Sequence, residues 1–194
     1  AGCHTSFPAY VLGGFDHRPE MADDDGNPPY YVISDIIGGG MGGAEGLDGL
    51  NAIDSHGGNC AILSAEIMET LSPVRVTRTE LAEGSGGKGR FRGGLGILRD
   101  YQLLTGGGIL TGYCQQPRPD TVPWGLEGGE DGKPAVMVHN PGTDREKNLK
   151  SKMVGMTLER GDVLRLVGAG GGGWGDPATR DAVLTDRDRV EGYA

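Results

Sequence analysis

His56 is the side chain in this sequence best placed for acid–base chemistry. It lies in the segment AIDSHGGN, between a glycine-rich loop at 38–49 and a run at 59–70 that predicts a helix. A histidine at such a junction can act as a general base or a metal ligand, because its charge changes near neutral pH. Asp48 and Asp54 lie nearby in the sequence. The plainer interpretation is that His56 is a surface or capping histidine and that Asp48, in GLDG, fixes a turn.

Three other groups of residues could bind a metal or react. Glu66 and Glu69 are three residues apart and would share one face of the predicted helix, although a pair of this kind is usually solvated. Cys3 and His4 have the right chemistry for a metal, but adjacent residues chelate poorly unless the chain is extended. Cys60 would lie at the start of the helix, where the helix dipole can lower a thiol pKa, although a buried structural cysteine is commoner. The sequence therefore leaves the identity of any metal unknown.

The glycine motif GxGxxG occurs three times, at 38–43, 84–89 and 168–173. It binds phosphate when a strand precedes it and a helix opens directly after it, and no helix is expected directly after any of the three. With 38 glycines in 194 residues, chance matches are expected. There is also no GxxxxGK[ST] motif, since Lys88 is followed by glycine. We therefore predict no cofactor-binding residues here, and expect the glycines to form tight turns and close backbone contacts.

The arginines beside the second glycine motif have two possible roles. They can form surface ion pairs, worth only about 0–1 kcal/mol each. Alternatively, Arg92 can hold a buried carboxylate bidentately, which would matter more. The surface pairs in question would join Arg90, Arg92 and Arg99 to Glu80, Glu83 or Asp100.

Composition excludes several classes of protein. The net charge is −9 and no block of Lys and Arg appears, which argues against a nucleic-acid partner. No apolar run approaches the roughly 18 residues of a membrane-spanning helix. The three cysteines are widely spaced, with no CxxC, which fits reduced thiols in a cytoplasmic protein. Ordering so many glycines costs chain entropy, which suggests support from a partner chain.

Most of the chain reads as strands, and we predict one β-rich α+β unit over residues 1–194, with irregular glycine-rich strands and one or two helices. The segment 74–81, VRVTRTEL, alternates apolar and polar residues as a half-buried strand does. Asn59 is a candidate cap for the helix at 59–70. Residues 1–29 are expected to be an irregular lead-in with an exposed acidic turn, and 176–194 a charged tail with a short helix. Further strands are expected at 30–37, 91–104 (one or two), 108–115 and 135–139, and after a turn at Gly161-Asp162 within 156–167.

Seven segments in order carry a resemblance to a known family. They are IIGGGMGG (36–43), GLDGLN (46–51), GNCAILSAEIMETLSPVRVTRTEL (58–81), GSGGKGRFRGGLGILRDY (84–101), VPWGLEGG (122–129), LERGDVLRL (158–166) and GAGGGGWGDP (168–177). Together they resemble the C-terminal third of a chain of the hydantoinase B/oxoprolinase family, also called HyuB-type. The resemblance covers almost the whole chain from about Tyr30.

The resemblance implies one part of a larger catalyst. HyuB-type chains work with a HyuA-type subunit, and the pair hydrolyses cyclic amides such as hydantoins or 5-oxoproline with ATP. ATP and Mg would be bound mainly by that partner. A divalent metal, Zn or Mn, would lie in the N-terminal part of the HyuB-type chain, which this sequence lacks. The partners implied are therefore the HyuA-type subunit and the upstream part of the HyuB-type chain, and the chain alone is expected to be inactive.

The resemblance also implies site residues. It carries over His56 and Asn59 as pocket residues, and Asp48 completes the candidate catalytic set. Two other functions remain open at this point. Relatives carboxylate ketones, as acetone and acetophenone carboxylases do, and the chain can also be a non-catalytic scaffold of such a complex.

Overall fold

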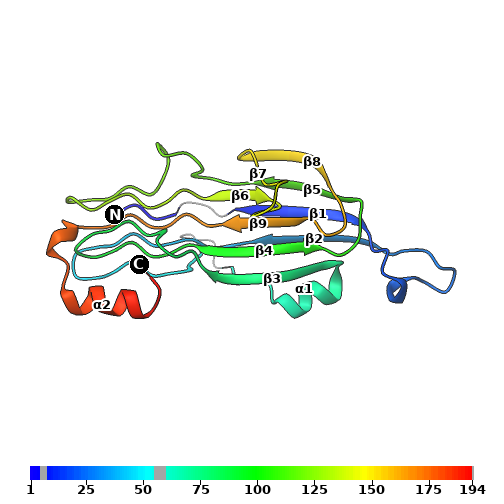
Figure 1. Cartoon of the computed structure of the whole chain (residues 1–194), viewed down its shortest axis with the longest axis horizontal. Helices are drawn as coiled ribbons and strands as arrows, with labels where there is room; N and C mark the ends of the chain where they lie inside the picture. The colour runs from blue at the N-terminus through cyan, green and yellow to red at the C-terminus, as the bar shows by residue number, and fades with distance from the viewer. Residues whose placement is uncertain (5–7, 55–59, 194) are drawn as a thin grey trace.

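A computed structural model of the protein describes residues 1–4, 8–54 and 60–193. Two antiparallel sheets form the part drawn on the right of Figure 1, and extended glycine-rich segments run leftward from them. Sheet one has the strand order β2 (Tyr30–Ile36), β1 (Ala9–Phe15), β5 (Gly108–Tyr113), β8 (Lys152–Leu158). Sheet two has the order β3 (Val74–Leu81), β4 (Ile97–Leu103), β9 (Val163–Val167), β6 (Val136–His139), β7 (Lys147–Asn148). The fold is thus β-rich α+β, as predicted.

The two sheets pack face to face around one core. Alternation along each strand places every second side chain inward, and the rings of Tyr10 on β1 and Tyr101 on β4 meet edge to face with centroids 4.8 Å apart. Helix α1 (Ala65–Leu71) lies against β3 and β2 and contributes the fully buried Met68. The core residues shared by the two sheets include Leu12, Ile33, Leu110, Val74, Leu103, Met137, Leu164 and Leu166.

Two predictions about the elements were wrong. The lead-in at 1–29 is not wholly irregular, because Ala9–Phe15 forms β1, which pairs with both β2 and β5 inside sheet one. The helix predicted at 59–70 begins only at Ala65, and Ser64 caps it by accepting a hydrogen bond from the Ile67 amide at 3.2 Å. The physical reason is that residues 60–64 serve another contact, since the Leu63 carbonyl accepts a hydrogen bond from Arg99 at 2.8 Å.

The remaining elements agree with the sequence predictions. The turn at Gly161-Asp162 separates β8 from β9, and Gly161 has φ of 88°. The acidic turn at 23–27 is exposed, and Asp23 accepts from the Asn27 amide at 2.8 Å. The charged tail contains α2 (Ala182–Val190), capped by Asp181, while short 3-10 helices occur at Pro19–Met21 and Pro177–Thr179.

The glycine-rich segments form a second structural layer, which we call the glycine bundle (1–4, 38–53, 84–96, 123–133 and 168–175). The last of these segments lies at its centre, and its amides donate hydrogen bonds outward in several directions. The bonds run from Gly170 to Lys133, from Gly171 to Gly94, from Gly172 to Gly2 and from Gly173 to Glu130, at 2.8–3.2 Å. Neighbours can approach on every side only because the central residues lack a Cβ. At Gly171, for example, a Cβ would lie 2.0 Å from the Met41 carbonyl oxygen.

Candidate functional site

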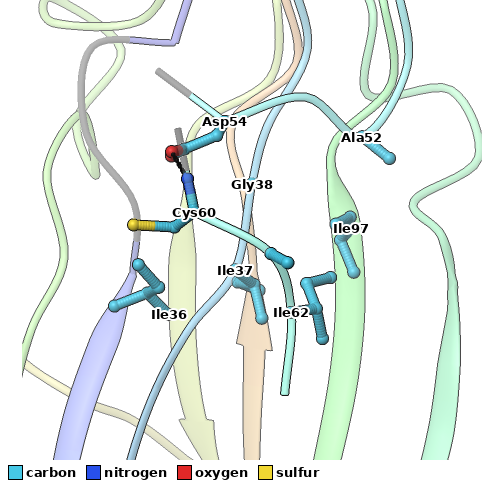
Figure 2. Close-up of a pocket in the computed structure, with 9 residues that line it drawn as sticks. Ile36, Ile37, Gly38, Ala52, Asp54, Cys60, Ile62 and Ile97 are labelled. Atoms are coloured by element: carbon cyan, nitrogen blue, oxygen red, sulfur yellow. Dashed lines mark hydrogen bonds between the residues drawn. The ribbon is translucent and has the colours of Figure 1, made fainter. Parts of the chain in front are cut away.

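A cavity of about 300 Å³ opens where the glycine bundle meets the sheets. Figure 2 shows Asp54 and Cys60 together at one end, where the Asp54 carboxylate accepts a hydrogen bond from the Cys60 amide at 2.6 Å. The other side chains in the wall are aliphatic, so the cavity joins a polar end to an apolar one. Its lining consists of Ile36, Ile37, Gly38, Ala52, Asp54, Cys60, Ala61, Ile62 and Ile97. We call it the Asp54 pocket.

Two of the three predicted site residues, His56 and Asn59, lie outside the described residues. The structure does place the two residues that flank their segment. Asp54 and Cys60 both line the Asp54 pocket, so the chain enters and leaves the segment 55–59 at that pocket. A role for His56 and Asn59 stays a prediction.

Asp48, the third predicted residue, lies among arginines and does not line the Asp54 pocket. Its carboxylate accepts hydrogen bonds from Arg180 at 2.7 and 2.9 Å, from Arg187 at 3.1 Å and from the Arg92 amide at 2.8 Å. Burial acts to raise the pKa of Asp48, but the hydrogen bonds from Arg180 and the Arg92 amide outweigh it and lower that pKa. The side chain therefore holds distant segments together as a carboxylate, and a catalytic role for it stays a prediction.

Asp188 on α2 extends this cluster, which we call the arginine cluster (Asp48, Arg92, Arg180, Arg187 and Asp188). Its carboxylate, only 4% exposed, accepts from Arg92 at 3.1 Å and from Arg180 at 2.6 Å. The prediction that Arg92 holds a buried carboxylate is confirmed, although through a single nitrogen. Sequence reasoning missed Asp188 as the partner because 96 residues separate the two, and no local pattern links them.

A second cavity, of about 340 Å³, lies beside the arginine cluster. Its wall combines the glycine motif at 84–89 with the arginines and the last residues of the chain. Besides those glycines, its lining comprises Lys88, Arg92, Leu95, Pro177, Arg180, Thr185, Asp188 and Tyr193. The Arg92 guanidinium also lies 4.7 Å from the centre of the Tyr193 ring, a cation–π contact that adds to the attachment of the C-terminal segment.

A buried ion pair ties the Asp54 pocket to the core. Arg99 on β4 donates to the Asp35 carboxylate at 2.7 Å, and the Tyr101 hydroxyl donates to the same oxygen at 2.8 Å. Burial raises the pKa of Asp35, against the opposing effects of the Tyr101 hydroxyl and the Arg99 charge. The same guanidinium holds the Leu63 carbonyl and so fixes the segment that follows Cys60. The surface pairs predicted for Arg99 were wrong, because Arg99 points into the core and Asp100 pairs with Arg165 instead.

The other metal candidates have different partners. Glu69 accepts from the Val76 amide at 3.0 Å, while Glu66 is exposed, so the two do not converge on one point. The Cys3 sulfur accepts from the Gly42 amide at 3.2 Å. Within residues 1–4, 8–54 and 60–193, no group of three His, Cys, Asp or Glu side chains is placed to hold a metal ion.

The amides of the glycine motifs are engaged inside the bundle. Those of Gly40 and Gly43 donate to the Ala169 and Gly172 carbonyls, at 2.8 and 2.9 Å, and the amide of Gly87 donates to the Gly171 carbonyl at 2.8 Å. A phosphate cradle needs amide N–H groups that point at the ligand. The structural interpretation of these motifs therefore agrees with the observed hydrogen bonds.

Comparison with known proteins decides the family. The sequence model of hydantoinase B/oxoprolinase matches residues 1–177. The chain belongs to this family. As a member of the hydantoinase B/oxoprolinase family, it is 31% identical over 188 residues to a putative D-/L-hydantoinase of Pseudomonas sp. (strain NS671), in its B-type chain, covering 96% of this chain and 31% of that protein.

Two solved structures share the fold of this hydantoinase B/oxoprolinase chain. A nucleotide-free acetone carboxylase superposes with a TM-score of 0.71 at 18% identity, over 96% of this chain and 28% of the other. The ATP-dependent caprolactamase from Pseudomonas jessenii superposes with a TM-score of 0.70 at 22% identity, over 98% and 33%. The chain thus spans about a third of the length of these proteins. Among the described residues, none of the helices has the length and apolar character needed to cross a bilayer.

Proposed function

We propose that this chain is the C-terminal part of the HyuB-type subunit of an ATP-dependent cyclic-amide hydrolase of the hydantoinase or 5-oxoprolinase type. The observation that carries the proposal is the family match over residues 1–177. The names of two similar proteins agree with it, since one is called a hydantoinase and the other an ATP-dependent caprolactamase. In this proposal ATP and Mg are bound mainly by a HyuA-type partner in the cytoplasm, and the chain by itself is inactive.

The Asp54 pocket is the part of the chain that we assign to the active-site wall. Its aliphatic side can contact the methylene groups of a cyclic amide, and its polar end lies beside the segment that carries His56 and Asn59. His56 can take a proton from water as a general base, and Asn59 can hydrogen-bond the substrate amide. The bound ATP would supply a phosphoryl group that turns the amide oxygen into a better leaving group.

A reconstituted complex tests this function. The chain would be combined with the rest of its HyuB-type subunit and with the HyuA-type subunit, and phosphate release would be measured. We expect release that depends on a hydantoin, 5-oxoproline or caprolactam, and no release from the chain alone. We expect His56→Ala and Asn59→Ala to lower kcat by about 10²-fold or more, as loss of an acid–base group does. His17→Ala, at an exposed histidine far along the sequence, is the matched control.

A ketone carboxylase is the second candidate, because the acetone carboxylase shares the fold as closely as the caprolactamase does. Phosphate release that requires acetone or acetophenone together with bicarbonate would establish it and reject the hydrolase. Full activity of the His56→Ala/Asn59→Ala variant would instead favour a scaffold role for the chain.

A further inference from the structure

The outer face of sheet one is apolar, which is unusual for a surface open to water. Seven large apolar side chains on it are between 41% and 85% exposed. They come from all four strands of the sheet, so the exposure is not confined to one edge. We call this set the sheet-one face: Val11, Phe15, Tyr30, Val32, Ile109, Tyr113 and Val154.

Strand register makes the sheet-one face continuous. Phe15 on β1 is opposite Tyr30 on β2, and their rings meet with centroids 5.4 Å apart. Gly13 on β1 lies between Val32 on β2 and Ile109 on β5, so these two apolar side chains flank a position that has none. A groove of about 370 Å³ then runs along the β1, β5 and β8 side of the face. Its lining is mostly apolar and includes Val11, Tyr113, Met153 and Val154, with Lys152 as its single charge among the described residues.

Sheet two shows what a solvated outer face looks like in the same protein. There, Asp100 on β4 is opposite Arg165 on β9, and two hydrogen bonds of 2.7 Å join them. Arg78 and Glu80 on β3 also pair on that side. One outer face therefore carries ion pairs while the other carries aromatic and β-branched side chains. Contiguous exposed apolar patches of this kind mark interaction sites on soluble proteins.

We propose that the sheet-one face docks the rest of the HyuB-type subunit, that is, the two thirds of HyuB-type chains to which this chain does not align. This inference rests on the proposed subunit role. The length of the relatives supports it, because 96% of this chain matches only 31% of the Pseudomonas hydantoinase chain. Roughly twice as much further polypeptide therefore accompanies this fold in its relatives. It must pack against some part of the fold, and the sheet-one face offers apolar area without charges that would be desolvated.

Charge substitutions on the two sheets give a direct test. The tagged partner would be a polypeptide comprising the rest of the HyuB-type subunit from the same genome, co-expressed with this chain. The docking variant would be Val32→Lys/Ile109→Lys, at side chains 62% and 55% exposed. The control would be Thr77→Lys/Gln102→Lys on sheet two, which adds the same charge. Thermal melts of all the chains check that each substituted chain is folded.

We expect the wild type and the control to co-purify with the tagged partner and the docking variant to be retained at least tenfold less. Equal retention of the docking variant would overturn the proposal. Sedimentation velocity on the chain alone covers the rival occupant: a wild-type dimer that the docking variant converts to monomer assigns the face to a second copy. Phosphate release separates this inference from the proposed function. An active complex that forms with the docking variant rejects only the docking face, whereas a complex that assembles through the face but hydrolyses no ATP with any cyclic amide rejects only the function.

Discussion

Replacing Gly171 by alanine should strongly destabilise the protein, because the glycine bundle has no room for a side chain at its centre. The new Cβ would lie 2.0 Å from the Met41 carbonyl oxygen, whereas ordinary contact begins at 3.4 Å, a deficit of 3.4 − 2.0 = 1.4 Å. The neighbouring backbone atom cannot rotate away as a side chain can. Gly171 must therefore separate from its neighbours or force them apart.

The cost follows from the hydrogen bonds that such a shift breaks. The Gly171 amide donates to Gly94, the Gly94 amide donates to Met41, and the Gly171 carbonyl accepts from Gly87, at 2.8–2.9 Å. Each bond is worth about 1 kcal/mol net, and overpacking costs about 1–3 kcal/mol more. We expect a loss of about 4–6 kcal/mol in the free energy of unfolding, against a total of about 5–15 kcal/mol for a typical domain.

Urea unfolding followed by circular dichroism measures this loss. With a slope of about 2 kcal/mol per molar urea, the midpoint should fall by about 2–3 M. Gly142→Ala is the control for backbone conformation, since Gly142 has φ of 76° and open space around its Cβ position, and should cost about 1–2 kcal/mol. Gly112→Ala, whose Cβ would lie 3.2 Å from the Ala9 carbonyl oxygen, should change the free energy by less than about 1 kcal/mol. A midpoint for Gly171→Ala no lower than that for Gly142→Ala would refute the reasoning.

Three further perturbations address the charged groups. Arg99→Met should cost about 3–5 kcal/mol in urea unfolding because it leaves Asp35 buried without its ion pair, and the Asp35→Leu/Arg99→Met double variant should recover most of that loss; no recovery would contradict the account. Asp188→Asn should speed hydrogen exchange in α2 at least tenfold, measured by mass spectrometry, while exchange in β4 stays unchanged, because the buried Asp188 carboxylate anchors an otherwise exposed helix to two arginines. The lowered pKa of Asp48 means that its contribution to stability is present above its unfolded pKa of about 3.9 and disappears as the pH falls through the lower folded value. Asp48→Asn should therefore reduce stability at pH 7 and flatten its fall below about pH 4, and a pH profile of unfolding parallel to that of the wild type would argue against this.

The sequence alone determined most of the strands and the family. Strict alternation at 74–81 predicted β3, because a strand with one buried face needs that period and no long-range information. The turn at Gly161 was readable for the same reason, since a positive φ has a local signature in glycine. The glycine clusters indicated close backbone contact, and the structure shows that contact throughout the bundle.

Only the tertiary structure decided which residues meet. Arg92 and Asp188 are 96 residues apart and Arg99 and Asp35 are 64 apart, so nothing in their neighbourhoods could identify them as partners. The start of α1 depends on the same long-range contacts, because the hydrogen bond from Arg99 to Leu63 holds an apolar segment extended that local propensity would have made helical. Hydrophobic period and glycine conformation act over a few residues, whereas ion pairs and bundle packing depend on chain segments that folding alone brings together.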